Sequence, residues 1–540
     1  MTESLLKVHQ LTVEFRQSGK AIDDVSFELF SGETFALVGE SGSGKSITAL
    51  TVLRLLPETA KVLSGSVKLQ QFDLFAMPEA DVCKIRGRRI AMIFQDPMTS
   101  LNPVMTIGRQ IEESIQLHFN YSRQVIKSKV IALLSQVEIP EPERRCIEYP
   151  HQLSGGQLQR VMIAIALAGE PDLLIADEPT TSLDVTIQEQ ILKLLANIQQ
   201  RTGMTLWIIS HDLALVSKIA SRVAVMQQGK IVESGSCKDL FSHARHPYTQ
   251  KLLAALPSMD SCLGRRSGKR SPLLEVADFK VYYPIRKGIF KRIAAYVPAV
   301  DGVSFILRQG TTLALVGESG CGKTTLGKGL LNLIDSHAGR VLLDGVCLQD
   351  LRGEKLRKKR VEMQIVFQDP YSSMNPRMLV NEIIAEGIRS LNPGLSATDR
   401  LNKVQQLLQK VGLPSNSGER YPHEFSGGQR QRICIARALA VEPKLIICDE
   451  PTSALDVSVQ AQIIQLLKTL QQQQGISYLF ITHDLAVVAE IAHEVAVMYQ
   501  GKIVELGHVE QVLKEPKHDY TKKLLQAVPI LNDAALAETG

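Results

Sequence analysis

The chain has 540 residues, of which 44% are hydrophobic and 22% are charged. This length exceeds what a single hydrophobic core usually serves, so more than one soluble domain is expected. The net charge of +5 comes without a long basic stripe, which argues against nucleic acid as a partner. The basic run RRSGKR at residues 265–270 is expected to be a solvated linker.

The cysteines and the N-terminus indicate the cellular compartment. None of the eight cysteines shows C-x-x-C spacing, which argues against a zinc site or a disulfide framework and favours a reducing cytosol. The start MTESLLKVHQ lacks the features of a signal peptide. No apolar run reaches the roughly 18 residues of a membrane-spanning helix. A role at a membrane would therefore require docking onto other subunits.

Five stretches occur twice, in the same order and at a nearly constant offset. This predicts a tandem duplication with one domain at 1–257 and another at 273–540, joined by a polar, exposed connector at 258–272. The second copy has additional basic and aromatic residues at 285–296. They predict a longer hairpin or loop, either solvated or in contact with a partner.

Short apolar runs alternate with helical patterns in each copy. TFALV (34–38) and TLALV (312–316) are flanked by glycine, as is typical of buried parallel strands. Longer amphipathic runs, such as IQEQILKLLANIQQ, separate the apolar runs. The alternation predicts an α/β fold with a mostly parallel sheet in each copy.

The first apolar strand of each copy leads into the pattern G-x-x-x-x-G-K-[ST]. Glycine-rich backbone N–H groups and a helix N-terminus can surround phosphates there. We expect Lys45 and Lys323 to reach the β- and γ-phosphates, and Ser46 and Thr324 to ligate Mg²⁺. The other expected nucleotide contacts of the two loops are Gly39, Ser41, Gly42, Gly44, Gly317, Ser319, Gly320, Gly322 and Thr325.

An acidic pair closes a later apolar strand in each copy, as Asp177-Glu178 and Asp449-Glu450. Parallel sheets bind ligands at the carboxyl ends of their strands. The aspartates could hold Mg²⁺, and the glutamates could polarise an attacking water. A lone acidic pair is usually a solvated turn, but the buried strand and the P-loop favour the catalytic interpretation.

The stretches LSGGQ (153–157) and FSGGQ (425–429) precede helical runs. A serine followed by glycines predicts a helix N-terminus with open backbone donors, which is a second phosphate-binding surface. This surface need not serve the P-loop of its own copy. The residues concerned are Ser154, Gly155, Gly156, Gln157, Ser426, Gly427, Gly428 and Gln429.

With these motifs in this order, the sequence resembles the ATP-binding subunits of ABC transporters, twice and over nearly its whole length. The resemblance implies two tandem P-loop NTPase domains, each with a mostly parallel sheet, a helical subdomain that carries the SGGQ signature and an antiparallel β region. It also implies head-to-tail stacking, in which Lys45 would face Ser426 and Lys323 would face Ser154.

The resemblance assigns four further pairs of residues, one member in each copy. They are Gln95 and Gln368 for Mg²⁺ and the water, Asp184 and Asp456 for communication across the dimer, His211 and His483 for the γ-phosphate, and Phe15 and Tyr283 for stacking on adenine. Both glutamates, both histidines and both signatures are present, so we expect hydrolysis in both copies.

Several additional stretches resemble the oligopeptide, dipeptide and nickel importer ATPases. They are SLNP, SMNP, YPH and the tails HPYTQKLLAALP (246–257) and HDYTKKLLQAVP (518–529). The fused form resembles single-chain ATPases of bacterial peptide importers, including those for microcin C. The resemblance implies two permease subunits, an extracytoplasmic solute-binding protein and a peripheral position at the cytoplasmic face of the inner membrane.

Alternatives remain open at this point. Glutathione importers also have fused ATPases, and nickel is a further substrate of related importers. Ribosome-associated twin ABC proteins have a long, charged helical linker, whereas the connector here is short. Some peptide-importer ATPases hold an iron–sulfur cluster in a cysteine-rich tail. Here the first tail has only Cys237 and Cys262, and no cysteine follows Cys448, so we expect no cluster.

Overall fold

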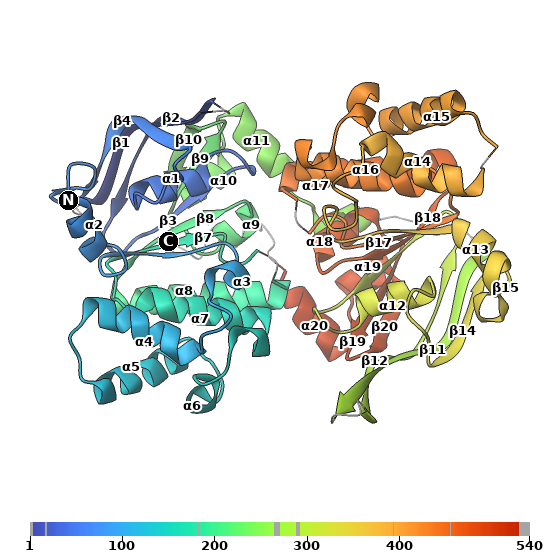
Figure 1. Cartoon of the computed structure of the whole chain (residues 1–540), viewed down its shortest axis with the longest axis horizontal. Helices are drawn as coiled ribbons and strands as arrows, with labels where there is room; N and C mark the ends of the chain where they lie inside the picture. The colour runs from blue at the N-terminus through green and yellow to red at the C-terminus, as the bar shows by residue number, and fades with distance from the viewer. Residues whose placement is uncertain are drawn as a thin grey trace. The chain divides into compact units, whose positions relative to one another are not determined.

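The computed structural model describes residues 4–16, 19–181, 183–263, 270–287, 292–392, 394–453 and 455–528 (Figure 1). The chain divides into two compact units, one built mainly from residues before Leu256 and the other mainly from residues 256–528. Each unit contains one copy of the repeat. Of the regions singled out in the sequence, connector residues 264–269, insertion residues 288–291 and the end of the chain from 529 lie outside the described residues.

The described part of the first unit contains two β-sheets. A six-stranded sheet has the order β10-β9-β3-β8-β7-β6, with parallel pairs from β9 to β6 and β10 antiparallel to β9. An antiparallel sheet has the order β2-β1-β4-β5. The strands are β1 (Ser4–Phe15), β2 (Gly19–Phe30), β3 (Thr34–Val38), β4 (Ala60–Leu69), β5 (Phe72–Asp73), β6 (Ile90–Ile93), β7 (Leu173–Asp177), β8 (Thr205–Ser210), β9 (Arg222–Gln227) and β10 (Lys230–Ser236).

Helices cover the faces of this sheet and fill the connections between its strands. The described helices of the first unit are α1 (Lys45–Val52), α2 (Glu79–Ile85), α3 (Pro97–Ser100), α4 (Ile107–His118), α5 (Arg123–Gln136), α6 (Pro142–Arg145), the 3-10 turn η1 (Pro150–Gln152), α7 (Gly155–Leu167), α8 (Val185–Thr202), α9 (Leu213–Val216), α10 (Cys237–Ser242) and α11 (Pro247–Ala254).

The central strand β7 shows how the sequence builds two cores. Its side chains alternate between the faces of the sheet, as the geometry of a strand requires. Leu173 and Ile175 join a core shared with the antiparallel sheet and α1. Leu174 and Ala176 join a core shared with α4, α5, α7 and α8. Figure 1 shows these helices on one side of the central strands and β1, β2 and β4 on the other.

The second unit repeats this plan. Its sheets have the orders β16-β17-β18-β13-β19-β20 and β12-β11-β14-β15 among the described strands. The mostly parallel α/β fold predicted from the sequence is therefore confirmed in both copies. The strands are β11 (Pro272–Lys287), β12 (Arg292–Arg308), β13 (Thr312–Val316), β14 (Ala338–Leu343), β15 (Val346–Cys347), β16 (Met363–Val366), β17 (Leu445–Asp449), β18 (Ser477–Ile481), β19 (Glu494–Tyr499) and β20 (Lys502–His508).

The helices of the second unit also correspond to those of the first. Those described are η2 (Met259–Cys262), α12 (Lys323–Leu330), η3 (Leu348–Asp350), α13 (Gly353–Val361), α14 (Val380–Leu391), α15 (Ala397–Lys410), η4 (Ser415–Glu419), η5 (Pro422–Glu424), α16 (Gly427–Leu439), α17 (Val457–Gln474), α18 (Leu485–Ile491), α19 (Val509–Lys514) and α20 (Asp519–Gln526).

Two regions that the sequence marked as irregular have defined structure. The insertion at 285–296 extends a long antiparallel hairpin, because β11 pairs with β12 out to Lys287 and Arg292. Most of the described connector residues are exposed, as expected, but one part of the connector packs into the second unit. Connector residues 259–262 form η2, and the Cys262 side chain is fully buried in the core that α18, α19 and α20 share. A small apolar thiol at the end of a short helical turn explains why this part of the connector packs.

Candidate active site

The P-loop of each copy makes a tight turn that requires glycine. Gly39 and Gly44 have φ angles of 154° and 105°. A Cβ atom would lie 2.2 Å from the Met226 carbonyl oxygen at Gly39 and 2.6 Å from that of Ala21 at Gly44. Side chains essentially never approach backbone that closely, so the loop can run here only with glycine. Gly317 and Gly322 of the second copy meet the same restriction.

The remaining P-loop residues lie where the sequence predicted them, between the first parallel strand and the helix that follows it. Gly44 and Gly322 are the N-caps of α1 and α12, with left-handed backbone. Gly42 and Gly320 have φ angles of 78° and 80°. The others are Ser41 and Ser319 within the two turns and Thr325 in the first turn of α12.

The P-loop lysines fold back onto their own loops. Lys45 is buried, and its Nζ donates hydrogen bonds to the carbonyl oxygens of Gly39 at 2.7 Å and Glu40 at 2.8 Å. Lys323 makes the corresponding contacts in the second copy at 2.6 and 2.9 Å. Both ammonium groups are therefore held inside the turn that the glycines create.

A hydroxyl group joins each P-loop helix to the neighbouring acidic strand. Ser46 Oγ donates to Asp177 Oδ1 at 2.9 Å, and Thr324 Oγ1 donates to Asp449 Oδ1 at 2.9 Å. Burial raises the pKa of Asp177 to about 6, against the opposing effect of the Ser46 hydrogen bond. Burial also raises the pKa of Asp449. The two carboxylates thus lie in partly dehydrated positions beside a hydroxyl.

The glutamate after each aspartate lies at the centre of a polar cluster. Gln95 Nε2 donates to Glu178 Oε2 at 2.7 Å, and His211 Nδ1 lies 3.2 Å from Glu178 Oε1. Burial alone would raise the pKa of Glu178, but the hydrogen bond and charge of His211 lower it below its ordinary value, assisted by Lys45. The structure therefore favours an ionised Glu178 carboxylate.

The second copy has the same cluster. Gln368 Nε2 donates to Glu450 Oε2 at 2.9 Å, and His483 Nδ1 lies 3.4 Å from that oxygen. The pKa of Glu450 is again lowered, because His483 outweighs the effect of burial. Burial would lower the pKa of His483, but the Glu450 carboxylate raises it overall.

Each glutamate also has an unusual backbone conformation. Glu178 and Glu450 both have φ of 46°, in the left-handed region that non-glycine residues seldom adopt. Their amide N–H groups donate to the carbonyl oxygens of Ile209 and Ile481 at 2.9 Å. Strained backbone held in this way often aims a functional side chain.

The SGGQ stretches begin the signature helices α7 and α16. Ser154 is the N-cap of α7 and forms a capping box with Gln157, and Ser426 does the same with Gln429 in α16. Gly155 and Gly427 are the first residues of these helices.

The second glycine of each signature allows the helix to approach its neighbour. A Cβ atom on Gly156 would lie 2.8 Å from Ile187 Cγ2, and one on Gly428 would lie 2.2 Å from Val459 Cγ1. Ile187 and Val459 belong to α8 and α17, which follow Asp184 and Asp456 directly. Close packing therefore fixes each signature against the helix that follows the predicted communication turn.

The aromatic residues expected to stack on adenine lie at the edges of the two sites. Phe15 ends β1 and is half-buried. Tyr283 is 41% exposed in β11, and its hydroxyl lies 3.5 Å from Thr325 Oγ1 at the start of the P-loop helix. Tyr283 is thus placed beside the P-loop with part of its ring accessible.

Sequence reasoning missed several residues that contact the site. Thr181 Oγ1 donates to Glu178 Oε2 at 3.0 Å. Two tail tyrosines, Tyr248 and Tyr520, contact the P-loop backbone. The repeat of Y-T in both tails was a signal for the tyrosines, but it did not indicate which part of the fold they touch.

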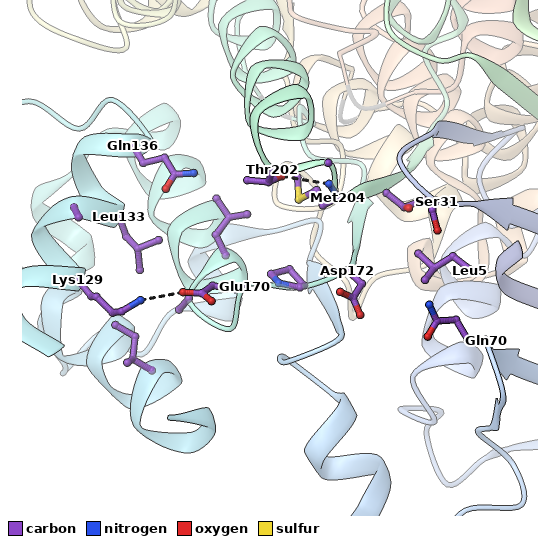
Figure 2. A pocket seen from close by; sticks show the side chains of 17 residues that line it. Leu5, Ser31, Gln70, Lys129, Leu133, Gln136, Glu170, Asp172, Thr202 and Met204 are labelled. Carbon is purple, nitrogen blue, oxygen red and sulfur yellow. Dashed lines mark hydrogen bonds and ion pairs between the residues drawn. The ribbon is translucent and has the colours of Figure 1, made fainter. Parts of the chain in front are cut away.

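A separate cavity of about 470 Å³ lies at the amino ends of β7 and β8, away from the P-loop (Figure 2). Figure 2 shows Lys129 and Glu170, joined by an ion pair, on one side and Leu5 and Gln70 on the other. The predicted catalytic residues are not among those that line this cavity.

With this geometry in place, comparison with known families identifies the class of protein. The model of the ABC transporter family matches residues 22–181 and 300–453. The model of the oligopeptide/dipeptide transporter C-terminal region matches residues 232–283 and 504–539. The chain therefore belongs to the ABC transporter family, whose ATPase domains bind ATP, and the predicted family is confirmed.

Individual relatives extend over almost the whole chain. The peptidoglycan transport ATP-binding protein YejF of Agrobacterium fabrum is 49% identical over 97% of this chain and 96% of its own length. The glutathione import ATP-binding protein GsiA of Salmonella paratyphi A is 48% identical over 98% of this chain and 90% of its own length. Among solved structures, cbiO1 of Clostridium perfringens covers 46% of this chain and 92% of its own, at 27% identity and a TM-score of 0.40.

Proposed function

We propose that this chain is the ATP-hydrolysing subunit of a peptide importer and that both copies carry a working site. The observation that supports this most directly is a coincidence of groups within each copy. The groups that meet at the carboxyl ends of neighbouring parallel strands are the P-loop lysine, the hydroxyl–aspartate pair, and the glutamate together with its glutamine and histidine. Parallel sheets bind ligands at this edge.

The donor atoms beside each P-loop fit a magnesium ion. Ser46 and Asp177 present hydroxyl and carboxylate oxygens 2.9 Å apart, and Thr324 and Asp449 do the same. Mg²⁺ prefers such oxygen ligands and usually keeps several waters. Gln95 and Gln368 would complete these sites through their amide oxygens. When bound, the ion would offset charge on the phosphates.

The chain's own residues perform the remaining tasks. Lys45 and Lys323 would bind the β- and γ-phosphates, while the P-loop amides and helix N-termini surround them. Glu178 and Glu450, held as carboxylates, would orient a water and accept its proton. His211 and His483 would contact the γ-phosphate and hold the glutamates in place. Phe15 and Tyr283 would stack on adenine.

The two copies would complete each other's sites. In each copy the signature helix packs on one face of the central sheet, and the P-loop helix packs on the opposite face. A phosphate that contacts both a P-loop and a signature is therefore more easily held between the P-loop of one copy and the signature of the other. We propose that Lys45 faces Ser426, that Lys323 faces Ser154, and that Asp184 and Asp456 communicate between the copies.

Partners follow from the names of the relatives. None of the helices in the described part of the chain is long and apolar enough to cross a membrane. Because the relatives are named as transport and import ATP-binding proteins, we propose that two permease subunits recruit the chain to the cytoplasmic face of the inner membrane, and that a solute-binding protein delivers the substrate. The tail matches favour peptides, while the GsiA relatives make glutathione the second candidate.

Replacing both glutamates by glutamine tests the chemistry. Glu178→Gln with Glu450→Gln should retain ATP binding and lose about 100-fold or more in turnover, because the general base is removed. Steady-state phosphate release and equilibrium ATP binding measure the two effects. Glu170→Gln with Glu442→Gln is a matched control, since these exposed glutamates pair with Lys129 and Lys403. Turnover within tenfold of the unaltered chain in the double variant would refute the role.

Uptake assays separate the substrate candidates. In cells that contain the permease and solute-binding protein, the chain should support uptake of labelled di- and oligopeptides, and the double glutamine variant should not. Uptake of glutathione or Ni²⁺ alone would replace the peptide assignment. Co-sedimentation with ribosomes instead of membranes would indicate a ribosome-associated protein.

A further inference from the structure

Each copy ends in a tail helix that places a tyrosine against the P-loop. Tyr248, at the start of α11, accepts a hydrogen bond through its hydroxyl from the backbone N–H of Glu40 at 3.3 Å. Tyr520, at the start of α20, accepts one from the N–H of Glu318 at 2.9 Å. The contact recurs in both copies although more than two hundred residues separate its partners along the chain.

The tyrosine and the P-loop lysine contact the same peptide unit of the P-loop. Lys45 Nζ donates to the carbonyl oxygen of Gly39, and Tyr248 accepts from the N–H of Glu40. These two groups are the opposite ends of one planar peptide unit. The tyrosine therefore fixes the orientation of the carbonyl that receives the lysine. Lys323 and Tyr520 hold the Gly317–Glu318 peptide in the same way.

The tail is anchored so that the tyrosine has a defined position. Glu233 in β10 accepts hydrogen bonds from the N–H groups of Arg245 and His246 at 2.8 and 3.2 Å. His246 Nδ1 in turn caps α11 by accepting from the N–H of Tyr248 at 3.2 Å. Partial burial would raise the pKa of Glu233, but the Thr249 side chain and the N–H groups of Arg245 and His246 lower it overall, so the anchor stays ionised at neutral pH.

The second copy has an equivalent anchor. Glu505 accepts from the N–H groups of Lys517 and His518 at 2.9 and 3.1 Å, and His518 Nδ1 caps α20. The Tyr520 ring also packs on Tyr499, with 4.3 Å between the ring centroids. Spacing from the glutamate through the capping histidine to the tyrosine is identical in the two tails.

We propose that Tyr248 and Tyr520 are positioning residues, through which the peptide-importer tail sets the conformation of the P-loop and hence the affinity for nucleotide. This inference rests on the proposed function, since it assumes that these loops bind the phosphates of ATP. A peptide plane held only by the lysine could rotate when the lysine contacts phosphate. The hydroxyl keeps the plane in place by holding its other end.

Removing single hydroxyl oxygens tests the proposal. The parent is the full chain with Glu178→Gln and Glu450→Gln, in which ATP binding can be titrated with little turnover. Tyr520→Phe should weaken binding at one of the two sites about 3- to 10-fold, the usual net worth of one hydrogen bond. Tyr248→Phe should have the same or a smaller effect, because its hydrogen bond is longer. Calorimetry measures the binding of Mg–ATP, which is the probe. The midpoint of thermal unfolding is measured in parallel for each variant.

Three further variants make the result specific. Tyr499→Phe is the matched control, because its hydroxyl accepts from Gln500 on the exposed side of the same ring pair; it should leave affinity unchanged. Added to Lys323→Ala, which disables the second P-loop, Tyr520→Phe should have no additional effect on the remaining site. Glu505→Gln weakens the tail anchor without altering the ring and should reduce affinity in the same direction as Tyr520→Phe.

The outcomes are separable. Weaker binding confined to the altered copy supports the proposal. A lower midpoint of thermal unfolding with unchanged ATP affinity would show that the tyrosine is purely structural, and would overturn the proposal. The proposal would also be overturned if neither the midpoint nor the affinity changed. A parent that binds no ATP would instead contradict the proposed function.

Discussion

The two copies agree closely in the groups that would contact nucleotide and differ in the residues that surround them. The glutamine–glutamate distances are 2.7 and 2.9 Å, and the hydroxyl–aspartate distance is 2.9 Å in both copies. By contrast, Ser43 corresponds to Cys321 and Gln227 to Tyr499, and Thr325 is the one expected P-loop contact whose counterpart, Ile47, differs in kind. The comparison indicates that the two copies have the same reacting groups but that different side chains pack around these groups.

Packing around the tail illustrates the difference. In the second copy the Tyr520 ring packs at a tilt against Tyr499, while Gln227 occupies that position in the first copy. The hydrogen bond to the P-loop is also shorter in the second copy, at 2.9 Å against 3.3 Å. These contacts lead us to expect that the tail holds the second P-loop more firmly than the first.

Single glutamate variants give the largest expected effect and test whether the sites are equal. Glu178→Gln and Glu450→Gln should each lower turnover in the altered copy by about 100-fold or more, because each would remove the proposed general base, which a glutamine and a histidine contact in both copies. Each single variant should then retain half of the original rate or less, and the two residual rates should agree. Near-full activity in one variant and near-total loss in the other, measured by phosphate release, would show unequal sites.

A smaller effect, on stability, is expected at the second signature glycine. Gly428→Ala should destabilise its copy by about 1–3 kcal/mol, because the new methyl overlaps the stiff Val459 side chain. Gly156→Ala should cost less, since its contact with Ile187 is longer, 2.8 Å against 2.2 Å. Thermal and denaturant unfolding measure both. Adding Val459→Ala to Gly428→Ala should restore part of the lost stability, because it removes the overlapping methyl groups. If stability is not restored, the overlap with Val459 is not the cause of the destabilisation.

The smallest effect is expected for Cys321→Ser. The first copy already has serine, Ser43, at this place in the P-loop, and both side chains are buried. ATP affinity and turnover should therefore stay within about twofold, below the worth of one hydrogen bond. A larger change would mean that the thiol beside Lys323 distinguishes the second site from the first.

Much of this arrangement could be predicted from the sequence because its signals are local. The glycines, lysine and hydroxyl of each P-loop are consecutive, and each acidic pair directly follows an apolar strand. Parallel topology then brings Gln95, Glu178 and His211 together, since all three lie within two residues of the ends of neighbouring strands. The roles of these residues remain predictions, although their proximity is a feature of the structure.

The contacts that could not be predicted join segments that no local pattern relates. Tyr248 meets Glu40 only because β10 and α11 fold back over the P-loop. Gly156 meets Ile187 only because α7 and α8 pack side by side on the sheet. Such contacts depend on tertiary packing, and the sequence showed only that the tyrosine, the P-loop glutamate and the signature glycine recur in both copies.

The burial of Cys262 bears on where one copy can be separated from the other. The repeat ends before this residue, yet its side chain fills a place inside the second unit, and nearby Asp260 pairs with Lys514. A fragment that starts at residue 273 would lack the Cys262 side chain and would have a cavity in the core beneath α18. Excision of an intact second half should therefore begin no later than Leu256, where the long continuous part of the second compact unit begins.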